Sequence, residues 1–291
     1  MIERAVIVTK KTQLEELIER FNSKAQAQFY LERLKRAIPT ALKQHVIERA
    51  FLPNYLFSEQ DLVIPIGPDG LVVNTSKYLG AQWILAVNPD PQRVDGVLTP
   101  FSVDEAGDWV RRAVAGRVSL HPVSMAHAAL NDGQELFAFN DLFIGPRSHI
   151  SIRYRIEYAG RAEDQSSSGV IVSTGAGSTG WLQSIVTGSV HVAAAVLKAE
   201  LTPPAPEAYR LPWEADQLYF TVREPFTSRT SQANLVFGAL HGKEKLVLRS
   251  YLPENGVIFS DGIERDYLNF NSGAVATIGL AERKAQLIAR A

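Results

Sequence analysis

Two uninterrupted apolar runs constrain this chain most: DLVIPIG at Asp61–Gly67 and QWILAVN at Gln82–Asn88. A run without polar alternation suits a strand buried on both faces of a parallel sheet. A shorter run of the same kind stands at Ala5–Val8. Helical spacing near residues 12–21, 29–34, 71–79 and 103–115 predicts helices that cover such a sheet. We therefore predict an N-terminal Rossmann-like α/β domain over residues 1–117.

Beyond residue 117 the pattern changes to stretches in which every second residue is polar or charged. They stand at Leu136–Ile144, Ile150–Tyr158, Gln217–Val222, Val257–Phe259 and Ala274–Ile278. Such alternation is typical of strands with one buried face, so residues 118–291 are predicted to form a β-rich, sandwich-like domain. The C-terminal tail of this domain can pack back on the first domain.

Composition excludes several classes of protein. Thirty basic residues against 31 acidic ones leave a formal charge of −1, so no overall field draws the chain to nucleic acid or to an anionic membrane. Because cysteine is absent, disulfides and zinc–thiolate sites are excluded, and six scattered histidines predict no metal site. We see no leader-like segment and no approach to the ~20 uninterrupted apolar residues of a membrane span. The expectation is a cytoplasmic protein.

The GPDG turn at Gly67–Gly70 joins a predicted buried strand to a predicted helix. The carboxyl edge of a parallel sheet and a helix N-terminus meet at such a junction, which favours a bound phosphate. Asp69 could act there as a general base or position a metal ion. The alternative is an ordinary turn in which Asp69 caps the helix.

A second segment, Ser166–Trp181, reads SSSGVIVSTGAGSTGW and predicts a strand, a loop and a helix. Its glycines allow backbone N–H groups to approach a ligand, and its hydroxyls can donate to phosphate. The predicted phosphate ligands here are Gly175, Gly177 and Ser178. The spacing is neither that of a P-loop nor that of GxGxxG, and a flexible linker is the alternative.

Two further segments carry patterns with more than one interpretation. AGSTG at 176–180 nearly matches the G-x-S-x-G nucleophile elbow of hydrolases, with Asp216 and His241 following in hydrolase order, so an esterase is an alternative. In FNDLFIG, Asn140 and Asp141 interrupt a strand-like run, which marks a bulge, an edge or a ligand contact.

Taken in order, the GPDG turn, VNPDPQRVDG at Val87–Gly96, FNDLFIG and VSTGAGSTGW resemble the NAD kinase family, which has a GGDG turn, an Asn-Glu/Asp pair and a TGSTAY-like loop. The resemblance is closest to the mitochondrial-type branch, with its VNxDPxR and TGTGSxAW-like segments. An Arg-Glu-Pro sequence at 223–225 and FNSGAVA at Phe270–Ala276 extend it. It covers the chain from about residue 61 to its end.

The resemblance implies phosphorylation of the NAD 2′-hydroxyl with ATP, with Mg²⁺ balancing charge on the nucleotide. Asp69 would deprotonate or orient that hydroxyl, and Gly67 and Gly70 would line the phosphates. The implied NAD-binding residues are Asn140, Asp141, Ser168, Thr179, Gly180, Trp181 and Ser184, with Trp181 stacking on the dinucleotide. Because members of the family commonly self-associate, a homo-oligomer is expected, with a dimer favoured.

Two residues depart from the family pattern in the turn. Pro68 replaces its second glycine, which removes a backbone N–H, and Leu71 replaces the threonine that follows. An NAD(H)-binding protein with impaired catalysis is therefore the alternative function. Lipid kinases and phosphofructokinases share a GGDG-like turn and form a third option.

Overall fold

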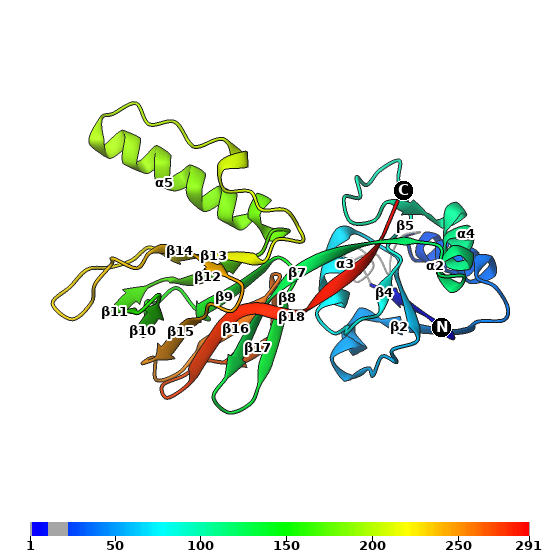
Figure 1. Ribbon diagram of the computed structural model, residues 1–291, viewed down its shortest axis with the longest axis horizontal. Helices are drawn as coiled ribbons and strands as arrows, with labels where there is room; N and C mark the ends of the chain where they lie inside the picture. The colour runs from blue at the N-terminus through cyan, green and yellow to red at the C-terminus, as the bar shows by residue number, and fades with distance from the viewer. Residues whose placement is uncertain (1, 11–22, 291) are drawn as a thin grey trace. The chain divides into compact units, whose positions relative to one another are not determined.

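The computed structural model describes residues 2–10 and 23–290. The helix predicted near residues 12–21 lies outside the described residues. The chain divides into two units, Met1–Pro122 with Lys284–Ala291, and Val123–Arg283. Figure 1 labels the helices and strands of both units.

The first unit is built on a parallel sheet. Its strands are β1 (Arg4–Thr9), β2 (Lys43–Glu48), β3 (Asp61–Pro65), β4 (Trp83–Ile84) and the end of β18 (Val275–Ala289). They run in the order β18-β4-β3-β1-β2. Every residue of β3 is buried, which is the environment that its apolar run predicts. The prediction of one strand over Gln82–Asn88 is wrong, because the run divides into β4 and β5 (Val87–Asn88), and β5 pairs with β6 (Phe101–Ser102).

Helices of the first unit pack against this sheet, and two of them, α2 and α4, also pack against each other. The helices are α2 (Ser23–Ala37), the 3-10 helix η1 (Arg49–Asn54), α3 (Asp69–Ser76) and α4 (Val103–Val114). A capping box between Ser102 and Glu105 starts α4. A Cβ at Gly107 would lie 2.6 Å from the carbonyl oxygen of Ala37, so only glycine allows α2 and α4 to approach this closely.

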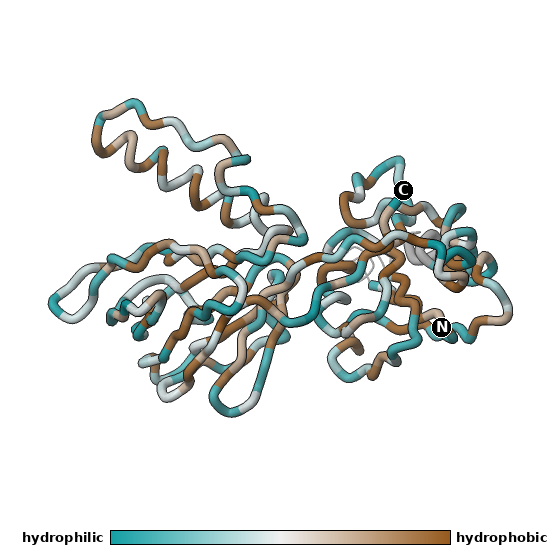
Figure 2. Tube along the Cα trace, in the orientation of Figure 1, coloured by the Kyte–Doolittle hydropathy of each residue, from teal (hydrophilic) through white to brown (hydrophobic). Residues whose placement is uncertain are grey.

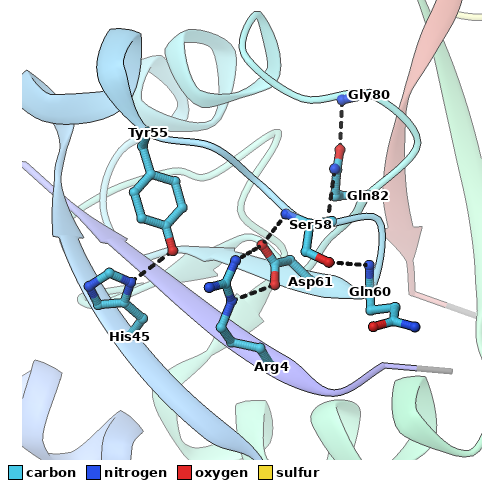
Figure 3. A network of polar contacts seen from close by, with 8 residues as sticks. All are labelled: Arg4, His45, Tyr55, Ser58, Gln60, Asp61, Gly80 and Gln82. Atoms are coloured by element: carbon cyan, nitrogen blue, oxygen red, sulfur yellow. Dashed lines mark hydrogen bonds and ion pairs between the residues drawn. The ribbon is translucent and has the colours of Figure 1, made fainter.

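Figure 3 shows a polar network at the amino end of β3. The Asp61 carboxylate is fully buried and accepts two hydrogen bonds from the Arg4 guanidinium, both at 2.6 Å, and one from the Ser58 N–H at 2.8 Å. Gln82 donates to the Ser58 carbonyl at 3.0 Å and accepts from the Gly80 N–H. The network fixes β1 against β3 at the opposite end of the strand from the GPDG turn.

The second unit is a sandwich of two largely antiparallel sheets. One sheet contains β7 (Ser119–Leu130), β8 (Glu135–Ala138), β10 (Ile152–Tyr158), β11 (Arg161–Ser167), β15 (Leu246–Ser250) and part of β18. The other contains β9 (Asp141–Pro146), β12 (Gly169–Ser173), β13 (Gln217–Arg223), β14 (Phe237–His241), β16 (Gly256–Ser260) and β17 (Ile263–Asn269). Tyr154 and Leu248 from the first sheet share one core with Ile144, Val170 and Phe220 from the second.

Helix α5 (Trp181–Leu197) follows β12 and the short 3-10 helix η2 (Gly177–Thr179). Figure 2 shows apolar stretches along α5, and Val192, Val196 and Leu197 are 64%, 75% and 68% exposed. By length and composition alone Gly177–Leu197 could cross a membrane, a weak criterion that many helices of other proteins also meet. The proline-rich segment that follows contains the 3-10 helix η3 (Pro206–Ala208).

Candidate functional site

The GPDG turn connects β3 directly to α3. Pro68 is the N-cap of α3 with φ −72° and ψ 164°, and Asp69 is the first residue of the helix. That φ is the value to which the proline ring is restricted, so Pro68 fits the turn without strain. The Gly67 N–H donates to the Val87 carbonyl at 3.0 Å. The turn therefore lacks only the backbone N–H donor that any other residue would supply at position 68.

The carboxylate of Asp69 is held by the loop that follows the VNPDPQRVDG segment. Its two oxygens accept from the N–H groups of Val97 and Leu98, both at 3.1 Å, and from the Thr99 hydroxyl at 3.3 Å. These bonds join two motifs that lie about 28 to 30 residues apart in sequence. Asp69 is thus fixed in orientation at the carboxyl end of β3. Its Oδ1 accepts two of the three hydrogen bonds, so the free lone pair that remains is on Oδ2.

The VNPDPQRVDG segment folds back on itself. The Asn88 amide donates to the Val94 carbonyl at 2.8 Å and accepts from the Asp90 N–H at 3.0 Å. A side chain at Gly96 would overlap Thr99 and the Asn88 amide, so glycine is required there. The motif therefore builds the loop that holds Asp69.

In the second unit, Asn140 and Asp141 stand where the predicted strand breaks into β8 and β9. The Asn140 carbonyl accepts from the Thr174 N–H at 2.9 Å. The Asp261 carboxylate accepts from the N–H groups of residues 139, 140 and 141, at 3.1, 2.7 and 3.2 Å. The structure thus brings the Asn-Asp pair against the start of the glycine-rich loop.

Asp141 is the titratable group of this region whose environment is most unusual. Burial raises its pKa to about 7, and the nearby Asp261 charge adds to the rise while the Ser173 hydroxyl opposes it. Its Oδ1 is buried and has no hydrogen-bond partner among the described residues. A buried carboxyl oxygen without a partner is costly, and it marks a position where a bound ligand could supply the missing donor.

The glycines of the loop meet other backbone segments of the same unit. A Cβ at Gly175 would overlap the Pro212 carbonyl, and a Cβ at Gly177 would overlap the Asn140 carbonyl. Both glycines are therefore required for close packing of the protein on itself. Ser178 is fully buried, and its hydroxyl donates to the Gly175 carbonyl at 2.7 Å. A buried, backbone-bonded hydroxyl lacks the exposure of a nucleophile elbow, which argues against the esterase alternative.

The remaining predicted residues lie nearer the surface. Thr179, Gly180 and Ser184 are exposed, and Ser168 and Trp181 are half-buried. The Ser184 hydroxyl donates to the Gly180 carbonyl at 3.2 Å. The Trp181 ring stacks beside Phe143, with centroids 5.8 Å apart and planes 13° from parallel. These groups can meet a ligand without unfolding the loop.

Ser168 and Trp181 line a cavity of about 900 Å³ in the second unit. Sequence reasoning missed most of its other walls, which include Arg147, Arg223, Glu224, Phe259, Arg265 and Tyr267. The Arg-Glu-Pro sequence at 223–225 was part of the resemblance, but nothing in its pattern indicated a cavity wall. The other residues come from separate strand ends and loops, which only the fold gathers.

Within residues 2–10 and 23–290, no three His, Asp or Glu side chains are grouped to hold a metal ion.

The chain is similar to known NAD and NADH kinases. The NAD kinase of Chlorobaculum tepidum is 27% identical over 129 residues, which is 43% of this chain and 44% of that protein. The match thus spans less than half of the curated relative. The yeast NADH kinase complexed with NADH superposes over 100% of this chain and 84% of its own, with TM-score 0.63 and 15% identity. An NAD kinase from Archaeoglobus fulgidus, in complex with ATP, covers 98% of this chain and 93% of its own, with TM-score 0.57 and 16% identity. No protein-family model matches the chain.

Proposed function

Because the chain has the two-domain fold of the NAD kinases, and its sequence similarity supports that family, we propose that it transfers the γ-phosphoryl group of ATP to the 2′-hydroxyl of NAD. The observation that carries the proposal is Asp69, held by three donors at the carboxyl end of β3. The assignment to the mitochondrial-type branch stays a prediction from the sequence.

Asp69 is the proposed catalytic residue. Its Oδ2, which keeps one free lone pair, can accept the proton of the attacking hydroxyl or orient that hydroxyl for in-line attack. Since the loop at 97–99 already fixes the carboxylate, its orientation needs no further ordering when substrates bind. Gly67 and Gly70 would face the phosphates, and a side chain built at Gly70 would meet nothing within 4 Å.

In the second unit, the proposed NAD-binding groups fall into two sets. Thr179, Gly180, Trp181 and Ser184 are exposed or half-buried and can touch the dinucleotide directly. Asn140 and Asp141 lie beneath the loop, and the partnerless oxygen of Asp141 can accept from a ribose hydroxyl or, when protonated, donate to a ligand acceptor. Gly175, Gly177 and Ser178 support the loop that would carry the phosphate contacts.

Mg²⁺ is proposed as the companion of ATP. Magnesium in phosphoryl-transfer sites is commonly bound by one or two carboxylates and by the substrate phosphates, with several waters retained. That mode fits a chain whose described residues contain no dedicated ligand cluster. The ATP phosphates are the groups we would assign to the ion, which would neutralise charge on the transferring phosphoryl group.

We also propose that the protein is a homo-oligomer, with a dimer as the simplest form. The supporting observation is α5, whose residues from Trp181 to Leu197 include no Asp, Glu, Lys or Arg. Two copies can therefore pair along this exposed apolar helix without like-charge repulsion. Sedimentation velocity should show Val196→Asp dissociating the oligomer and Leu56→Asp, at another exposed leucine, leaving it intact. Equal behaviour of both variants would reject α5 as the interface.

The test of the function is formation of NADP by the purified chain from NAD, ATP and Mg²⁺. NADH and inorganic polyphosphate, tested in parallel, would identify the preferred acceptor and donor. We expect NADP to accumulate with time and enzyme concentration. Binding of NAD by calorimetry without NADP from any donor would reject the kinase and favour the alternative, a dinucleotide-binding protein with impaired catalysis.

A further inference from the structure

Residues 199–216 form a return segment, which connects the end of α5 to the start of β13. Figure 1 shows the chain leaving the sandwich along α5 and coming back to β13. Lys198 ends the helix in a left-handed conformation, with φ 51° and ψ 41°. Proline rings restrict the backbone of the return segment even before the chain folds. The prolines are Pro203, Pro204, Pro206 and Pro212.

The return segment is anchored at two places in the second unit before it enters β13. Tyr209 is buried, and the N–H groups of Tyr209 and Arg210 donate to the Pro206 carbonyl at 3.2 and 2.8 Å. The Trp213 carbonyl accepts from the Ser124 N–H of β7 at 2.8 Å. The residues between these anchors, at positions 210–212, are therefore restrained at both ends.

Between its anchors the return segment lies on the glycine-rich loop at residues 174–180. The Leu211 N–H donates to the Ser178 hydroxyl at 3.4 Å, and that hydroxyl donates to the Gly175 carbonyl at 2.7 Å. A Cβ at Gly175 would lie 2.0 Å from the Pro212 carbonyl oxygen. Because Gly175 has no side chain, the backbone of the return segment packs directly on the backbone of the loop.

Asn140 holds the same loop at a second point. Its carbonyl accepts from the Thr174 N–H at 2.9 Å, and a Cβ at Gly177 would lie 2.3 Å from that carbonyl oxygen. The loop is thus held by two separate backbone segments, while residues 179–181, which follow the held part, are exposed or half-buried. A loop restrained in this way has little conformational entropy left to lose when a ligand binds.

We propose that the return segment is a positioning element for dinucleotide binding, in which Leu211 and Pro212 hold the glycine-rich loop in the conformation that binds NAD. The inference rests on the proposed function, because it concerns the loop that is proposed to contact the dinucleotide. Leu211 and Pro212 act through the loop and not on the ligand. They limit the conformations of the empty loop, whereas the bound loop is ordered in any case. Their loss should therefore raise the KM for NAD and leave kcat unchanged.

The test compares the same substitution at two prolines of the return segment. Pro212→Gly frees the backbone where it contacts the loop, and Pro204→Gly is the matched control at an exposed proline before η3. Both substitutions remove the same restriction from the unfolded chain, so a difference between the variants reports on the folded loop. By calorimetry, Pro212→Gly should bind NAD about 5- to 30-fold more weakly, the effect of ordering about one residue of backbone on binding. Pro204→Gly should stay within about twofold of the wild type, and kcat at saturating NAD should stay within about twofold in both variants.

Hydrogen exchange followed by mass spectrometry measures the loop itself. In the absence of ligand, peptides that cover residues 174–180 should exchange about fivefold faster or more in Pro212→Gly than in the wild type or in Pro204→Gly. Saturating NAD should restore slow exchange in Pro212→Gly, because the bound loop is ordered.

A double substitution tests the contact between the return segment and the loop. Gly175→Ala forces a Cβ into the Pro212 carbonyl and should weaken NAD binding by about fivefold or more. When Pro212→Gly is already present, the return segment can move aside, so Gly175→Ala should weaken binding by a further factor of less than about two.

Equal NAD affinities of Pro212→Gly and Pro204→Gly would overturn the inference, and so would loop exchange that ignores Pro212→Gly. A loss confined to kcat, with the affinity for NAD unchanged, would overturn it as well. Binding and turnover fail separately. If no NADP forms but Pro212→Gly weakens NAD binding, the kinase proposal is rejected and the positioning role stands. If NADP forms and Pro212→Gly binds NAD as tightly as the wild type, the kinase stands and the positioning role is rejected.

Discussion

The GPDG turn of the first unit and the Asn140-Asp141 segment of the second each place an acid at the end of a strand, but the protein treats the two acids differently. Asp69 accepts three hydrogen bonds from residues 97–99. Asp141 has a buried oxygen without a partner among the described residues, and burial raises its pKa to about 7. The first acid is oriented before any substrate arrives. The second acid keeps one oxygen without a hydrogen-bond donor, which is expected of a group that binds a ligand or changes its protonation state.

The largest effect is expected at Asp69. Asp69→Asn removes the base, so kcat for NADP formation should fall by about 10²–10⁴-fold, while the affinity for NAD changes less than twofold. Thr99→Val is the matched control for the structural role of Asp69, because it removes one donor at 3.3 Å and keeps the carboxylate. Its activity should change less than tenfold, with a stability loss of about 1 kcal/mol. An Asp69→Asn variant with near-normal kcat would remove Asp69 from the mechanism.

Asp141 should make stability depend on pH. Its folded-state pKa of about 7 exceeds the ordinary value of 3.8, so between these pH values the folded chain keeps a proton that the unfolded chain has lost. Stability should therefore fall as pH rises through this window, by at most about 1.4 kcal/mol per pH unit, and level off above it. Urea unfolding of the wild type and Asp141→Asn at pH 5, 6, 7 and 8 measures the difference. Parallel profiles for the two proteins would show that Asp141 titrates normally.

Alanine substitutions at two glycines, one in each region, should change the stability of the protein in opposite directions. Gly177→Ala forces a Cβ into the Asn140 carbonyl, and overpacking of this kind costs about 1–3 kcal/mol. Gly70→Ala meets nothing within 4 Å and lies in the first turn of α3, where alanine favours the helix by about 0.5–1 kcal/mol. The midpoint temperature of thermal unfolding should therefore fall in Gly177→Ala and rise in Gly70→Ala. If Gly177→Ala is as stable as the wild type, the loop is not packed as described.

The smallest effect is expected at Pro68. Pro68→Ala restores the missing backbone N–H at a φ of −72° that alanine also adopts. If phosphate binding lacks only this donor, kcat/KM for ATP should rise about tenfold, the value of one hydrogen bond to a charged group. Leu71→Thr is a poorer probe, because Leu71 is fully buried and its replacement would leave a cavity. Unchanged kinetics in Pro68→Ala would mean that the turn never used this donor.

Much of the fold could be predicted from the sequence, because its signals are local. The apolar run at Asp61–Gly67 predicted a fully buried strand, and β3 is buried throughout. Val103–Ala115 predicted a helix, and α4 spans Val103–Val114. The prediction of a single strand over Gln82–Asn88 is wrong, because the apolar character of this run does not reveal that it divides into β4 and β5.

The motifs of the candidate site could be predicted from the sequence, but the contacts between them could not. The GPDG turn and VNPDPQRVDG were recognised separately, but only the fold shows that the loop after the second motif binds Asp69. The sequence pattern predicts that Gly175 and Gly177 open toward a ligand, whereas in the fold their free side faces the protein backbone. The walls of the cavity beside Trp181 could not have been found, since Arg147, Phe259 and Tyr267 come from separate strand ends and loops.

The central claim is that ATP gives its γ-phosphoryl group to NAD on this chain. A single-turnover experiment with γ-labelled ATP, NAD and excess enzyme tests it most directly, with the Asp69→Asn variant alongside. We predict that the label appears in the 2′-phosphate of NADP with the wild type, and that this transfer is slowed by at least about 10²-fold in the variant. Label that stays in ATP or leaves as inorganic phosphate, while calorimetry shows both nucleotides bound, would contradict the account.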